Sequence, residues 1–242
     1  MSEPKTIFEN KDFVVVDKPA GLMVHAARVS GRRRGKKGSA DELRAVEPTL
    51  VDWLLVRYPE IKNVGDDPSV RPGIVHRLDK ATSGVMIVAR TPASFERLKK
   101  LFQEHRMAKT YFAVVEGAPK GKKGTIDAPI GIKSGSLKRS IHSSKMAKPA
   151  VTEYSVVKEL SGGGNDAARR TLLMVSPKTG RTHQIRVHLA SIGHPIVGDV
   201  LYGKKTGAPR LMLHASALAF SDGAGNRFEF EAPLPEDFAI RP

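Results

Sequence analysis

Cysteine is absent from the 242 residues of this sequence. The absence excludes disulfide bonds, thiolate metal sites and a cysteine nucleophile, and it fits a reducing compartment. Long apolar stretches are also missing, since no run approaches the roughly 20 residues that span a bilayer. The opening segment, residues 1–5, has no signal-peptide pattern. We therefore expect a cytoplasmic protein that does not cross a membrane.

Acidic residues are few relative to basic ones. Lysine and arginine number 40 against 25 aspartates and glutamates, which gives a formal net charge of +15 at pH 7. Such a chain is expected to bind a polyanion, and nucleic acid leads because its phosphates release counterions when many dispersed cations bind them. An anionic membrane surface is the competing partner, but the sequence contains no long basic amphipathic helix that would lie on one.

Metal ligands at a recognisable spacing are missing as well. His183, His188 and His194 tempt a metal interpretation. The first two are five residues apart on an expected helix, so they point to different faces, and no carboxylate lies in the segment. We therefore expect no metal site here.

The remaining pattern alternates predicted strands with a few helices. Several strands follow one another without intervening helices, which favours an antiparallel meander. Thr49 is a candidate N-cap for a helix over 50–56, and Thr91 followed by Pro92 marks the start of another. The predicted strands are 7–9, 13–17, 85–90, 109–117, 125–130, 151–160, 170–176, 211–220 and 227–231.

A third helix is expected near the second concentrated group of polar residues. Thr182 is its candidate cap, and Ile185, Leu189 and Ile192 recur at the spacing of a core-facing stripe. This arrangement leaves Arg181 at the corner between a strand and the helix.

The most concentrated chemistry lies in residues 71–84, which end in a Thr-Ser-Gly turn before a predicted buried strand. Within this segment Asp79 lies between two cations, Arg77 and Lys80. A loop held by a rigid strand is a common position for functional side chains. The alternative is that Asp79 only caps the turn through its side-chain oxygen. The segment alone does not separate these two interpretations.

Residues 73–84 contain Gly-Ile-Val-His-Arg-Leu-Asp-Lys followed by Thr-Ser-Gly, and they resemble the active-site motif of the RluA-like family of RNA pseudouridine synthases. Four other stretches agree with this family in order, and residues 213–215 continue the pattern. Five ordered motifs argue against turn capping as the only role of Asp79. The resemblance runs from about Ile7 to about Leu234, and the four stretches are 16–25, 109–113, 180–188 and 193–203.

The resemblance implies one catalytic domain over 1–242, with basic insertions near 28–47 and 133–148. The implied fold is α+β, with a mixed, largely antiparallel sheet, flanking helices and a cleft that holds RNA. The implied reaction isomerises specific uridines in rRNA or tRNA to pseudouridine. The N1–C1′ bond breaks, the uracil turns, and C5 joins the sugar. Since no second substrate takes part, no cofactor is expected, and the protein is expected to be a monomer.

Asp79 is implied as the catalytic nucleophile, which requires an ionised side chain. Burial raises the pKa of an aspartate above its ordinary value of about 3.9, and a paired arginine opposes this shift. By resemblance, Arg181 fills that role. Whether the carboxylate attacks C1′, attacks the ring or promotes elimination stays open. Tyr111 matches the family tyrosine that stacks on the target base and is a candidate for handling the C5 proton; the alternative is an ordinary core aromatic.

Five more residues are candidates for substrate binding. Arg77 resembles the residue that fills the gap left by a flipped base, although a phosphate contact would equally explain it. Ile185 and Leu213 are expected to line apolar pocket walls, with core packing as the alternative. His76 and Lys109 belong to the matching motifs and complete the set.

Two other classes of function stay open. A non-catalytic RNA-binding or ribosome-assembly protein would show the same charge. A serine hydrolase would need a Gly-x-Ser-x-Gly elbow, which is absent, and Ser83 lies in a turn beside Asp79. Many relatives carry an S4-type RNA-binding domain, for which the residues ahead of Ile7 are too few. We therefore expect the two insertions to contribute to RNA selection, with a compact stem-loop recognised by its shape.

Overall fold

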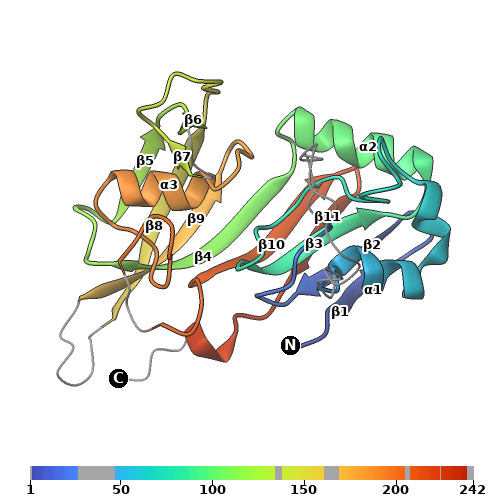
Figure 1. The fold of residues 1–242 in the computed structure, drawn as a ribbon, viewed down its shortest axis with the longest axis horizontal. Helices are drawn as coiled ribbons and strands as arrows, with labels where there is room; N and C mark the ends of the chain where they lie inside the picture. The colour runs from blue at the N-terminus through green and yellow to red at the C-terminus, as the bar shows by residue number, and fades with distance from the viewer. Residues whose placement is uncertain are drawn as a thin grey trace, which may run out of the picture.

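The fold is built on one large β-sheet (Figure 1). The computed structural model describes residues 2–26, 47–133, 138–160, 169–204, 208–223 and 225–238. The predicted insertion near 28–47 lies, apart from its last residue, outside the described residues.

Nine strands make up this sheet. Strands β3 and β10 pair in parallel, and the other pairings among the described strands of the sheet are antiparallel. The predicted mixed, largely antiparallel sheet is therefore confirmed. Across the sheet the order is β1 (Lys5–Glu9), β2 (Phe13–Lys18), β3 (Ser83–Ala89), β10 (Leu213–Ser221), β4 (Ala108–Glu116), β9 (Arg170–Pro177), β8 (Val151–Leu160) and β5 (Lys123–Asp127), while β11 (Arg227–Glu231) pairs with β10.

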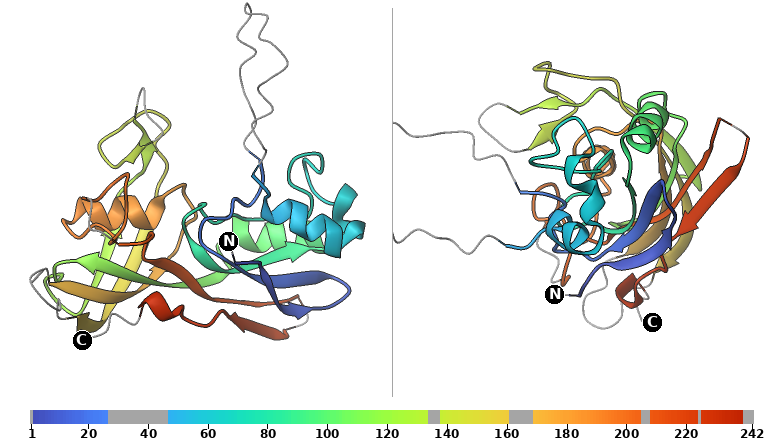
Figure 2. Two further views of the ribbon diagram at one scale, coloured as in Figure 1. Left: turned by 60° about the horizontal axis from the view of Figure 1, so that its bottom comes forward. Right: turned by 90° about the vertical axis from the view of Figure 1, so that its right-hand side faces the viewer.

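Helices cover the sheet, which confirms the α+β class. In the left view of Figure 2, α1 and α3 lie above the same face of the sheet. None of the helices within the described ranges has both the length and the apolar character that a membrane crossing requires. The helices are α1 (Leu50–Arg57), α2 (Pro92–Gln103) and α3 (Gln184–Ser191), with short 3-10 helices η1 (Pro59–Asn63) and η2 (Glu236–Phe238).

The second predicted insertion, near 133–148, includes part of a small hairpin. Strand β6 (Gly131–Ile132) pairs with β7 (Arg139–Ser140), and residues 134–137 lie outside the described part. In the left view of Figure 2 this hairpin stands above α3, on the side of the sheet that carries the helices. The described part of this stretch therefore includes one strand of a short hairpin, β7, whose partner β6 directly precedes the stretch.

Two apolar clusters fill the space between the helices and the sheet. One contains buried residues of α1, α2, β2 and β3, such as Leu54 and Leu98. The other contains buried residues of α3, β4 and β9, such as Leu189 and Leu173. Tyr111 on β4 packs against both clusters. The middle of the sheet, near Tyr111, is therefore where the two halves of the molecule meet.

The predicted starts of α1 and α2 are confirmed. Thr49 forms a capping box with Asp52, and Thr91 forms one with Ser94. In each box the threonine oxygen accepts a hydrogen bond from the N–H three residues on, and the later side chain accepts one from the threonine N–H.

The predicted start of α3 is wrong in detail. The residue before the helix is His183, in a left-handed conformation with φ 58°, and Thr182 is not the cap. The side chain of Gln184 accepts hydrogen bonds from the Arg181 N–H and the Thr179 hydroxyl, so it organises the entry to the helix. Ile192 was expected in the core, but it follows the helix and is 37% exposed.

Gly84 allows β3 and β10 to approach each other directly after the loop that carries Asp79. Its φ is +115°, and a Cβ there would overlap the backbone carbonyl of Ala215, its partner in the parallel pair. We predict that Gly84→Ala lowers the free energy of unfolding by about 3 kcal/mol or more, because both the backbone conformation and the strand contact would have to change. Urea denaturation measures this. The matched change Gly180→Ala meets no atom within 4 Å and should cost far less; equal losses would contradict the prediction.

Candidate active site

A pocket of about 650 Å³ lies where the loop before β3, α2, β4 and the loop before α3 meet. Its lining includes six arginine or lysine side chains and two aspartates, so it is positively charged overall. The structure brings together in this pocket every residue that the sequence singled out for catalysis or substrate binding: His76, Arg77, Asp79, Lys109, Tyr111, Arg181, Ile185 and Leu213.

Asp79 is held at the pocket by a buried arginine. The Nη1 of Arg186 donates to Oδ2 of Asp79 at 3.0 Å. The arginine side chain is 7% exposed and that of Asp79 is 21% exposed. The backbone carbonyl of Asp79, rather than its side chain, closes the turn by accepting the N–H of Thr82. The charge-assisted hydrogen bond from Arg186 holds this carboxylate oxygen in place.

A second aspartate fixes the orientation of Arg186. The Nε and Nη2 atoms of Arg186 donate to the two oxygens of Asp199 at 2.8 and 2.9 Å. Burial raises the pKa of Asp199, but the hydrogen bonds and charge of Arg186 outweigh it and leave that pKa below its ordinary value. The backbone N–H groups of Leu201 and Tyr202 also donate to Asp199. Arg186 therefore binds Asp199 through two of its nitrogens and Asp79 through the third.

The expected pairing of Arg181 with Asp79 is wrong. The Nε of Arg181 donates instead to the carbonyl of Pro149, and Arg181 is the more exposed of the two arginines. The loop before α3 turns Arg181 toward Pro149, whereas α3 itself directs Arg186 at Asp79. Arg181 still lines the pocket, so a role in binding stays a prediction.

Arg186 was not singled out from the sequence, although it lies inside the matching stretch 180–188. A usable signal was present, because Arg186 is flanked by Ile185, Val187 and Leu189 on a helix with a buried face. An arginine in such surroundings is rarely buried unless it is paired with an acid. The identity of the acid was not readable from sequence, since Asp79 and Asp199 reach it from two different loops.

The loop that carries Asp79 is also held in place by hydrogen bonds from a buried lysine. Lys18, which is 0% exposed, donates through Nζ to the carbonyls of Pro19, Leu22 and Lys80. Burial lowers the pKa of Lys18 to about 7, while the charges of Asp79 and Asp17 act in the opposite direction. This explains why a lysine stands in the earliest matching motif: it ties the end of β2 to the residue after Asp79.

Tyr111 and Leu213 line the pocket from neighbouring strands β4 and β10. Leu213 is buried at 4% exposure, and Tyr111 is partly buried. Burial, and then the charge of Asp79, raise the pKa of Tyr111, so the phenol keeps its proton at neutral pH. An aromatic ring in the wall of a charged pocket is suited to stacking on a planar group.

His76, Arg77 and Lys109 also line the pocket. His76 stacks on Phe102 and accepts the N–H of Ile87 through Nε2, and burial lowers its pKa to about 3, so its ring is neutral and held in place. Arg77 is exposed. Lys109 donates to the carbonyl of Thr179. Burial, followed by the charge of Arg181, lowers the pKa of Lys109 to about 8.

Two arrangements bear on the other chemistries considered. Ser83 and Nδ1 of His214 are 2.9 Å apart, but both residues are buried, and the other ring nitrogen lies 3.3 Å from the carbonyl of Ala232. This contact joins β3 to β10 rather than facing the pocket. Within the described ranges no group of three or more histidine, aspartate or glutamate side chains is arranged to hold a metal ion.

Comparison with known proteins identifies relatives of this sequence and of its fold. A sequence profile described as RNA pseudouridylate synthase covers residues 12–191. The chain is 37% identical over 251 residues to ribosomal large subunit pseudouridine synthase D of Nitrosomonas europaea, a match that covers 97% of this chain and 63% of that protein. It is also 37% identical over 257 residues to the protein of the same name in Pseudomonas aeruginosa, covering 98% of this chain and 70% of that one.

A solved structure agrees as well. Human RNA pseudouridylate synthase domain containing 1 superimposes with a TM-score of 0.73 at 27% identity, covering 96% of this chain and 83% of the human chain. The present chain spans less than two thirds of the length of its Nitrosomonas relative. With the profile covering most of the sequence, and both bacterial relatives matching nearly all of it, the chain belongs to the RNA pseudouridylate synthase family.

Proposed function

We propose that this protein isomerises uridine in RNA to pseudouridine without a cofactor, using Asp79 as the nucleophile. The proposal rests on the different hydrogen bonding of the two carboxylate oxygens of Asp79. Oδ2 accepts from Arg186, whereas no hydrogen bond within the described residues reaches Oδ1. One oxygen is thus held and the other is left for the substrate, inside a pocket large enough for a nucleoside.

Access to the pocket requires that the target uridine leave its stack. Flipping a base costs a few kcal/mol, and stacking on an aromatic ring returns roughly 1–3 kcal/mol of this. We assign the stacking to Tyr111, which lies in the pocket wall. The surplus of arginine and lysine around the pocket supports binding of the neighbouring phosphates.

The proposed chemistry is balanced within one substrate. Oδ1 bonds to C1′ while the N1–C1′ bond breaks, and its electron pair stays on the uracil. The uracil turns in the pocket, C5 bonds to C1′, and the bond to Oδ1 breaks. C5 then loses its proton and N1 gains one. Since the pKa of Tyr111 is raised, its phenol is protonated, and it would take the C5 proton only while passing its own proton on.

The names of two relatives refer to the large ribosomal subunit. We therefore propose RNA of that subunit, rather than tRNA, as the substrate. The test is tritium release from RNA labelled at uridine C5, prepared from cells that lack this enzyme, because C5 loses its hydrogen only when it becomes the new attachment point. Release is expected with large-subunit RNA. Absence of release from any RNA, with RNA binding intact, would favour a non-catalytic RNA-binding protein.

Lys109 gives the proposed complex a predicted pH dependence. With its pKa lowered to about 8, free Lys109 loses its charge above that pH. If it contacts phosphate, RNA affinity should fall by up to about tenfold per pH unit above pH 8, since binding then requires uptake of a proton. Fluorescence anisotropy between pH 7 and 9.5 measures this. Lys109→Arg keeps its charge throughout and should flatten the dependence; identical pH curves for both proteins would contradict the assignment.

A further inference from the structure

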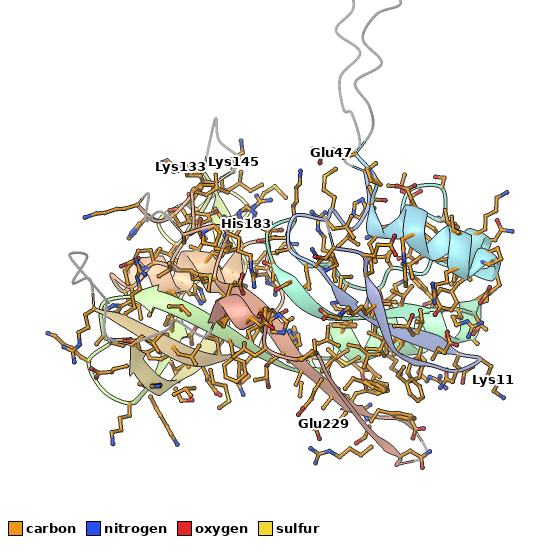
Figure 3. All side chains as sticks on the ribbon, turned by 90° about the horizontal axis from the view of Figure 1, so that it is seen from below. Lys11, Glu47, Lys133, Lys145, His183 and Glu229 are labelled. Carbon is orange, nitrogen blue, oxygen red and sulfur yellow. The ribbon has the colours of Figure 1, made fainter. Side chains whose placement is uncertain are left out.

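His183 lines the pocket, and the proposed mechanism gives it no role. It is a non-glycine residue at φ 58°, a conformation that is kept only where surrounding contacts impose it. Its side chain is 16% exposed, and its Nε2 lies 3.7 Å from Oδ2 of Asp79. Figure 3 shows His183 toward the middle of the molecule, on the side of Lys133 and Lys145.

The hydroxyl of Tyr202 is the polar neighbour that can set the tautomer of this histidine. It accepts the backbone N–H of Arg139 at 2.8 Å, and it lies 2.8 Å from Nδ1 of His183. A phenol has one proton to donate, and here the histidine nitrogen is positioned to accept it. Donation from the Tyr202 hydroxyl to Nδ1 requires the ring proton of His183 to be on Nε2, the nitrogen that faces Asp79.

Among the described residues, no protein group accepts a hydrogen bond from this Nε2–H. A separation of 3.7 Å from Oδ2 exceeds hydrogen-bond distance, and that oxygen already accepts from Arg186. Burial lowers the pKa of His183, while the charge of Asp79 acts in the opposite direction, so the ring is neutral at neutral pH. A neutral donor thus stands beside the carboxylate, inside the pocket.

We propose that His183 binds the target nucleoside by donating from Nε2–H to one of its oxygens, and that Tyr202 is a positioning residue that sets this tautomer. The relay begins at the backbone of Arg139, so the hairpin β6–β7 contributes to the site through a main-chain donor. This inference rests on the proposed function for its substrate, but the relay itself can be tested on the free protein.

The first test is the tautomer of His183, read from nitrogen-15 chemical shifts of the imidazole at pH 7.5 without RNA. We expect Nδ1 unprotonated and Nε2 protonated, with the signal assigned by its loss in His183→Asn. His76 supplies an internal contrast, because its Nε2 accepts the Ile87 N–H and its proton must be on Nδ1. In Tyr202→Phe the His183 signals should move toward a mixture of tautomers. An Nδ1–H tautomer in the wild type would overturn the relay.

The second test is single-turnover kinetics on the labelled RNA. Tyr202→Phe keeps the ring that lies 5.2 Å from the Arg186 guanidinium and removes only the hydroxyl. We expect its maximal rate to fall about tenfold, because loss of one aligned hydrogen bond weakens the positioning of the target nucleoside, while the RNA concentration for half-maximal rate stays nearly unchanged, because phosphate contacts dominate RNA affinity. Asparagine tolerates the left-handed backbone conformation, so His183→Asn should fold. Its maximal rate should fall roughly 10-fold to 100-fold.

The matched control is Tyr58→Phe, which also removes a hydroxyl with two partners, Thr6 and Glu9, but on the other side of the fold. It should leave the rate unchanged. Wild-type rates in Tyr202→Phe and His183→Asn, with tritium release intact in the wild type, would overturn the inference while the proposed function stands. If no RNA released tritium, the proposed function would fail and the tautomer measurement would still decide the relay.

Discussion

Asp79→Asn is expected to reduce tritium release by about 10⁴-fold or more, the scale at which removal of a covalent nucleophile acts. Asparagine is nearly isosteric, so it keeps the shape of the pocket but has no negative charge with which to attack C1′. The fold should persist, because Arg186 keeps both of its contacts with Asp199. The melting temperature and RNA affinity should therefore stay close to those of the wild type.

The control for this change is Asp237→Asn. Asp237 is likewise paired with an arginine, Arg210, from which it accepts two hydrogen bonds, but it does not line the pocket. It should retain wild-type rates. Substantial tritium release by folded Asp79→Asn would remove Asp79 from the chemistry and return the role of nucleophile to an unidentified group.

Replacing Arg186 should harm both stability and activity. Arg186→Met leaves Asp199, whose side chain is 0% exposed, without its partner. A buried charge left unpaired in this way costs about 3–5 kcal/mol, measured as the loss in free energy of unfolding at pH 7. Arg186→Lys keeps the charge, but a single ammonium cannot replace a fork that binds two carboxylates. It should fold and lose roughly 10²–10³-fold in rate.

The stability loss of Arg186→Met should depend on pH. In the wild type the pKa of Asp199 is lowered, so the pairing contributes fully above the unfolded value of about 3.9 and is lost as the pH falls through the lower folded value. In the variant, Asp199 can become neutral by taking up a proton. The difference between the two proteins should therefore narrow as the pH falls toward about 4. A constant difference from pH 7 to 4 would contradict the assignment.

The variant Arg181→Met tests whether Arg181 and Arg186 have different roles. Because Arg181 is more exposed and bonds only a carbonyl among its described contacts, its loss should change stability by about 0.5 kcal/mol or less. If Arg181 contacts RNA, affinity and its salt dependence should fall while the rate at saturating RNA is kept. A rate loss in Arg181→Met as large as that in Arg186→Lys would favour the original assignment of Arg181.

The sequence by itself determined most of the strands, two of the three helix starts and eight of the residues that line the pocket, although not Arg186 or His183. Alternation of apolar residues, capping threonines and a proline at the first helical position act over a few neighbours, so these signals are complete in the local sequence. The motif around Asp79 could also be recognised in the sequence, because its residues are contiguous.

Only the tertiary structure decided which arginine serves Asp79 and what His183 faces. Arg181 precedes α3 and Arg186 lies within it. Which of them reaches Asp79 depends on the loop before the helix, on the left-handed residue at position 183 and on the packing of α3. The second acid, Asp199, reaches Arg186 from a separate loop. Such pairings join segments distant in the chain, and their geometry is fixed by packing rather than by any local preference of the residues involved.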